Sequence, residues 1–160
     1  GPVAQNLDHV YRLTQAEMAY LNGLGVDAEG LLASMNARTN IQARRSARNY
    51  IERHGDPSGD IRRSVLTMHT IADSPVPVSS ERAYRELVAA EGQEELLVQV
   101  YTDGLGHCQF TSQQIMAVLL AADHWLDSMT PPDPADAAWF PPSAGFLPGY
   151  EPPPWPQPPQ

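Results

Sequence analysis

Residues 65–77 read VLTMHTIADSPVP, and this stretch decides the fold class of the chain. Its first seven residues are apolar or β-branched apart from one histidine, which is typical of a strand buried on both faces of a parallel sheet. The strand is expected to end at residues 72–75, where Ala-Asp-Ser-Pro favours a turn. Asp73 is therefore predicted to lie at the carboxyl end of a buried strand.

A second stretch of the same character follows at residues 96–101, LLVQVY, and it leads into a loop that contains His107. Ser79 or Ser80 is predicted to cap a helix over residues 81–90 between the two strands. The order strand, helix, strand implies a parallel, right-handed crossover. Asp73 and His107 are then expected at the same edge of the sheet, which is where ligands bind in parallel α/β sheets.

Three helices are expected ahead of the first strand. The first begins at a capping box formed by Thr14 and Glu17, and the second follows Asp27. The third is predicted to start at residue 39 or 40 and to end before residues 54–60, HGDPSGD, which break it.

A long helix is predicted over residues 113–129, and the chain then changes character. From Thr130 onward, 12 of 31 residues are proline, so this segment is expected to be extended or irregular. It still carries much apolar surface, in Trp139, Phe140, Phe146, Leu147, Tyr150 and Trp155. We expect an arm that packs along its own domain, and the alternative is a ligand for an SH3-type domain.

Two loops resemble those of a known family. Asp73-Ser74-Pro75-Val76-Pro77-Val78 is similar to the acid loop of α/β-hydrolases, and Gly106-His107-Cys108-Gln109-Phe110 is similar to their histidine loop. The chain order and the 34-residue gap between Asp73 and His107 fit the last two members of the catalytic triad. The resemblance is to the C-terminal portion of a bacterial serine esterase or peptidase.

The resemblance implies an α/β fold and divides the chain into three parts. Residues 1–60 would be a helical cap, residues 61–130 the C-terminal strand-helix-strand-helix part of the core, and residues 131–160 a Pro-rich arm. Asp73 would orient the imidazole, and His107 would be the general base. The expected substrate is a small ester or amide, and neither a cofactor nor a metal is expected.

The nucleophile of such a triad is not recognisable in these 160 residues. The family places its serine in a Gly-x-Ser-x-Gly turn upstream of the cap, and this pentapeptide is absent from the sequence. The segment Gly55-Asp56-Pro57-Ser58-Gly59 has the wrong spacing and no strand before it. A serine mechanism would need a further, N-terminal part of the hydrolase.

Cys108, His69 and a group of Asp and His residues near residue 124 are further candidates. Cys108 beside His107 is a possible nucleophile, but adjacent side chains in a loop usually point apart, so a buried thiol is the preferred interpretation. His69 is interpreted as a core histidine with a hydrogen-bond partner. Asp123, His124 and Asp127 share one turn of a helix, and a solvated face is preferred over half of a metal site.

Charge is distributed unevenly along the chain. The net charge is −9, and all ten basic residues are arginines that lie at or before residue 85. Residues 86–160 contain ten acidic residues and no basic one, so nucleic acid is not expected as a partner. The apolar runs are too short to span a bilayer, so no membrane association is expected. The sequence does not indicate a cellular compartment.

Three functions are compatible with the sequence. The chain could be one part of a serine hydrolase that is completed by an N-terminal fragment. It could instead be a hydrolase-derived enzyme without a nucleophile, such as a cyclase that uses Asp73 and His107 for proton transfer. The third possibility is a binding module. Because two buried parallel strands leave a sheet edge open, association with an N-terminal fragment or with a second copy is expected.

Overall fold

The computed structural model describes residues 4–7 and 9–155. The chain divides into two compact units, one formed by residues up to Asp56 and the other starting at Pro57.

The first unit contains α1 (Gln15–Gly23), α2 (Ala28–Asn36) and α3 (Arg45–His54). The predicted capping box at the start of α1 is present, with Thr14 accepting from the backbone of Glu17. Of the described residues in this unit, only Ala28 is buried. The unit therefore has almost no hydrophobic core of its own.

The predicted start of α3 at residue 39 or 40 was wrong, because the helix begins at Arg45. The backbone N–H of Ile41 donates to the Asn6 side chain, and the Ile41 carbonyl accepts from the Asn6 backbone. The Thr39 hydroxyl bonds the Asn36 carbonyl at the end of α2. The Ile41 carbonyl is therefore not available to the backbone N–H of Arg45, which a helix starting at residue 39 or 40 would require.

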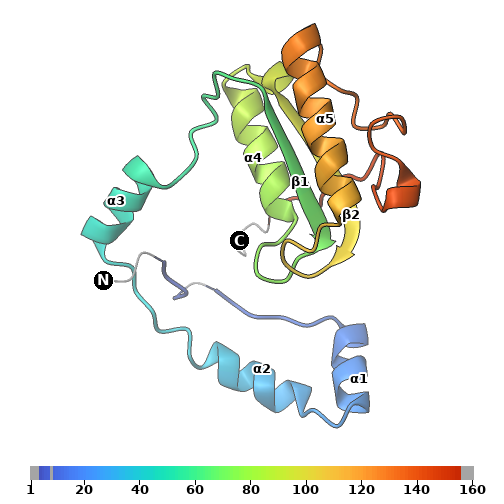
Figure 1. Cartoon of the computed structure of the whole chain (residues 1–160). Coiled ribbons are helices and arrows are strands. Elements are labelled where there is room, and N and C mark those ends of the chain that lie inside the picture. The colour runs from blue at the N-terminus through green and yellow to red at the C-terminus, as the bar shows by residue number, and fades with distance from the viewer. Residues whose placement is uncertain (1–3, 8, 156–160) are drawn as a thin grey trace. The chain divides into compact units, whose positions relative to one another are not determined.

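The second unit is built on two parallel strands, β1 (Val65–Ala72) and β2 (Leu97–Leu105), connected through α4 (Ser79–Ala90) and a short 3-10 helix η1 (Glu94–Leu96) (Figure 1). The predicted parallel pairing is present, with Val65 opposite Leu97. β2 is longer than the predicted strand, which ended at residue 101. The helix α5 (Ser112–Ser128) follows from a capping box of Thr111 and Gln114.

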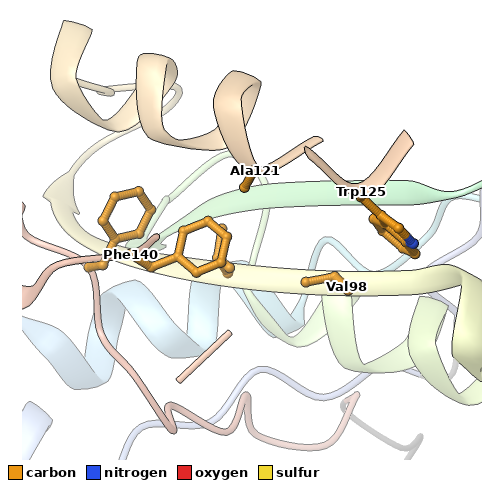
Figure 2. Close-up of a cluster of buried hydrophobic side chains, with 6 residues drawn as sticks. Val98, Ala121, Trp125 and Phe140 are labelled. Carbon is orange, nitrogen blue, oxygen red and sulfur yellow. The ribbon is translucent and has the colours of Figure 1, made fainter. Parts of the chain in front are cut away.

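The core lies between α5 and one face of the sheet (Figure 2). Val98 and Val100 of β2 pack there with Ala121 and Trp125 of α5. The opposite face meets α4, where Glu81 accepts hydrogen bonds from the side chains of Thr67 and Gln99. Because successive side chains of a strand alternate between faces, α4 and α5 cover opposite sides of the sheet.

The Pro-rich arm belongs to this core. Phe140 and Phe146 are almost completely buried, and their rings meet edge to face with centroids 5.3 Å apart. The arm also includes the short 3-10 helix η2 (Pro142–Ala144). The prediction that the arm packs along its own domain is confirmed.

The arm also pairs with the sheet, which the sequence did not lead us to expect. Thr102 and Phe146 form an antiparallel bridge, flanked by hydrogen bonds from Asp103 N–H to the Gly145 carbonyl and from Leu147 N–H to the Tyr101 carbonyl. Gly145 has a φ of +86°, and a Cβ there would meet the Asp103 carboxylate. The few proline-free residues of the arm thus close one edge of β2.

Candidate active site

Asp73 directly follows β1 and is held by the turn after it. Its Oδ1 accepts a hydrogen bond from the backbone N–H of Val76 at 3.0 Å. The side chain is only 5% exposed. The turn after β1 therefore orients the Asp73 carboxylate independently of its contact with His107.

A β-bulge brings the histidine loop beside Asp73. The strands are in register from Val65 to Thr70, but Ala72 pairs with Leu105, so β2 contains one extra residue. The Thr70 hydroxyl donates to the Gly106 carbonyl at 2.8 Å, and Gly106 N–H donates to the Ala72 carbonyl. Bulges of this kind redirect a strand end and its side chains.

His107 follows the bulge and contacts Asp73. The distance from its Nδ1 to Asp73 Oδ2 is 2.8 Å, as expected from the placement of the two loops. The imidazole is 52% exposed, whereas the carboxylate is buried. The pair therefore presents the far nitrogen of the ring, Nε2, toward the surface.

The ionisation of Asp73 decides the tautomer of His107. Burial alone would raise the pKa of Asp73, but the hydrogen bonds from Val76 and from His107 outweigh it, and the pKa lies below its ordinary value. The carboxylate is then ionised and can only accept a hydrogen bond, so Nδ1 must carry the proton. In the neutral imidazole, Nε2 holds a lone pair and can accept a proton.

Cys108 is the neighbour of that nitrogen. Its Sγ lies 3.5 Å from His107 Nε2, and the residue is exposed. The expectation that the two adjacent side chains point apart, with a buried thiol, was wrong. Cys108 has a φ of +52°, a left-handed conformation that turns its side chain back toward the ring.

The other candidate residues lie elsewhere in the second unit. His69 is half-buried on β1, and its Nδ1 is 2.8 Å from the Thr70 carbonyl. The ring of His124 on α5 stacks against Trp139 with centroids 4.9 Å apart. The described part of the chain contains no group of three or more His, Cys, Asp or Glu side chains placed to hold a metal.

A cavity of about 80 Å³ borders β2 and the arm, but it is not at this pair of residues. Arg85, Tyr101 and Glu151 line it together with other residues, and neither Asp73 nor His107 does. Arg85 and Glu151 form an ion pair at its rim. The His107 side chain is instead 52% exposed.

Comparison with known proteins gives one informative similarity. Over 118 residues, or 71% of this chain, the sequence is 27% identical to an o-phthalyl amidase from Xanthobacter agilis. The chain is similar to an amidase. It spans about a quarter of the length of that relative, since the match covers 26% of it.

Two further comparisons found no match. No family model matches the sequence. No solved structure matches it either.

None of the helices in the described residues is both long and apolar enough to cross a membrane.

Proposed function

We propose that the chain is the C-terminal part of a serine-type α/β-hydrolase that cleaves small amides or esters. Asp73 is the orienting acid and His107 the general base. The nucleophilic serine is supplied by a preceding part of the enzyme. The helical first unit would be the cap that shapes the substrate pocket.

One observation carries this proposal: the buried Asp73 carboxylate binds His107 Nδ1, and the half-exposed imidazole keeps Nε2 as its remaining acceptor. In a serine mechanism, Nε2 removes the proton from the serine hydroxyl as the oxygen attacks the acyl carbon. Asp73 stabilises the imidazolium that forms. The imidazolium then returns the proton to the leaving nitrogen or oxygen.

The similarity to an amidase supports hydrolysis of the bond between an acyl carbon and its leaving nitrogen or oxygen. An amine is a poor leaving group unless it is protonated as the carbon–nitrogen bond breaks. A histidine that is held in one tautomer by a buried carboxylate can provide that proton. Both an amide and an ester fit this chemistry.

The surface of the second unit supports the existence of a partner. In the described residues β1 pairs only with β2, so its other edge has free backbone groups. The outer face of α5 carries exposed apolar side chains at Ile115, Leu119 and Leu126. We propose that the preceding part of the hydrolase covers both, with a strand beside β1.

Without that part, the 160-residue chain is expected to associate with itself. In sedimentation velocity at low micromolar concentration, the main species should exceed the 17.5 kDa of one chain. Burial of the apolar face of α5 would drive the association. Leu119→Glu should shift the distribution toward the monomer, because it places a charge in that face.

Gln113→Glu, on the exposed first turn of the same helix, is the matched control and should leave the distribution unchanged. A wild-type monomer that melts cooperatively would show that the chain closes its own core. That result would favour a repurposed domain over a hydrolase part.

A serine-directed probe tests the function. When the reading frame is expressed with its upstream sequence, a fluorophosphonate should label one serine in the upstream part. The 160-residue chain should show no labelled serine, because it lacks the Gly-x-Ser-x-Gly turn. Labelling is read by mass spectrometry of the digested protein.

Heat-denatured protein is the control, since labelling that survives denaturation is nonspecific. A labelled serine within residues 1–160 would contradict the proposed division of the triad. A complete protein that resists the probe would favour the alternative, an enzyme that transfers protons through Asp73 and His107 without hydrolysis.

A further inference from the structure

We propose that Cys108 completes a thiol–imidazole–carboxylate arrangement with His107 and Asp73, and that this thiol is a nucleophile toward activated acyl groups. The inference rests on the proposed role of His107 as a base. It goes beyond that role, because it gives the 160-residue chain an acylation site that needs no upstream serine.

The contacts follow one another from the buried carboxylate to the exposed thiol. Asp73 Oδ2 is 2.8 Å from His107 Nδ1, and His107 Nε2 is 3.5 Å from Cys108 Sγ. The second distance is within hydrogen-bonding reach for sulfur. Because Nδ1 donates to the carboxylate, Nε2 is left as the acceptor for the thiol proton. Nucleophile, base and orienting acid are therefore in contact in the order that covalent catalysis requires.

The backbone of the histidine loop produces this arrangement. Gly106, with a φ of +98°, turns the chain after the bulge, and Cys108 follows in the left-handed region. For a residue with a side chain, this conformation is unfavourable because Cβ comes close to the following carbonyl oxygen. The strained turn brings two adjacent side chains together at the surface, where an acyl group can reach the sulfur.

The proposed reaction is acyl transfer in two steps. The Cys108 thiol gives its proton to His107 Nε2 as the sulfur attacks the acyl carbon of an activated ester. The carbon–oxygen bond breaks, the alcohol leaves with the proton from Nε2, and a thioester remains on Cys108. Water then attacks the thioester while Nε2 takes its proton, which releases the acid and restores the thiol.

The same nitrogen would serve an incoming serine in the complete hydrolase. Nε2 can accept only one proton at a time, so Cys108 and the serine compete for it. A serine that reached Nε2 would have to displace the thiol.

Alkylation by iodoacetamide tests the nucleophile directly. At pH 7 an unperturbed cysteine is only a few per cent thiolate, so Cys108 in the folded chain should react about tenfold faster than in the chain unfolded in urea. His107→Gln should reduce the rate to that of the unfolded chain, and Asp73→Asn should do the same, because an amide that donates to Nδ1 leaves the ring proton on Nε2. Because the His107 side chain is half exposed, its replacement should leave the fold intact. Circular dichroism checks that each variant is folded.

Para-nitrophenyl acetate tests the acylation step. The wild-type chain should release about one equivalent of nitrophenolate in a burst and gain one acetyl group on Cys108, and Cys108→Ala should show neither. A folded wild-type chain that reacts with iodoacetamide no faster than the unfolded one, or a His107→Gln variant that keeps the wild-type rate, would overturn this proposal. Fluorophosphonate labelling of the complete protein is independent of Cys108 and tests the hydrolase assignment separately.

Discussion

His107→Ala is expected to lower the kcat of the proposed complete hydrolase by at least about ten-thousand-fold. In the proposed mechanism the imidazole takes the nucleophile's proton, and among the described side chains only His107 hydrogen-bonds the Asp73 carboxylate. Asp73→Asn should cost roughly a thousand- to ten-thousand-fold. The amide can donate a hydrogen bond to Nδ1, which would move the ring proton to Nε2 and remove its lone pair.

The measurement is the steady-state rate of amide or ester hydrolysis by the protein expressed with its upstream sequence. Because neither side chain is proposed to bind the substrate, the loss should appear in kcat, with KM changed little. Glu94→Gln and Glu95→Gln, exposed side chains in η1, are matched controls and should keep wild-type rates. A His107→Ala enzyme within tenfold of the wild type would show that His107 is not the base.

The pair Asp73 and His107 could be predicted from the sequence because both follow strands with a strong and simple pattern. Apolar and β-branched runs are hard to place anywhere but in a buried sheet, and a helix between them implies parallel pairing. The carboxyl ends of paired parallel strands then meet at one edge. The 2.8 Å contact between the side chains follows from this topology.

The details of the histidine loop could not be predicted, because they depend on contacts between distant segments. The bulge that extends β2 past Thr102 is fixed by hydrogen bonds to β1 and by the bridge to Phe146 in the arm. The orientation of Cys108 depends on a positive φ, which is uncommon for a cysteine. Local sequence patterns carry no signal for either feature.

The structure of the Pro-rich arm could likewise be predicted from the sequence only in part. Its aromatic residues predicted that it packs on the domain, because so much apolar surface is unfavourable in water. The edge pairing at Gly145 and Leu147 was missed, because the prolines on both sides indicate a segment that cannot donate to a sheet. Only the position of the proline-free residues opposite β2 makes pairing possible.

Phe140→Ala is expected to lower the free energy of unfolding of the second unit by about 3–5 kcal/mol. Phe140 is completely buried and packs with Phe146 against the sheet, so the substitution leaves a cavity in the core. In a unit of this size the midpoint of thermal unfolding should fall by roughly 12 °C or more. Urea and thermal unfolding of the 160-residue chain, followed by tryptophan fluorescence, measure the change.

Leu105→Ala removes a large side chain that is 80% exposed, and it is the matched control, with an expected cost below about 0.5 kcal/mol. Phe140→Leu should fall between the two, because it keeps part of the buried volume. If Phe140→Ala unfolded like the control, the arm would not be part of the core in solution. The edge of β2 that the arm covers would then be open, and the second unit would need a partner on both sides of its sheet.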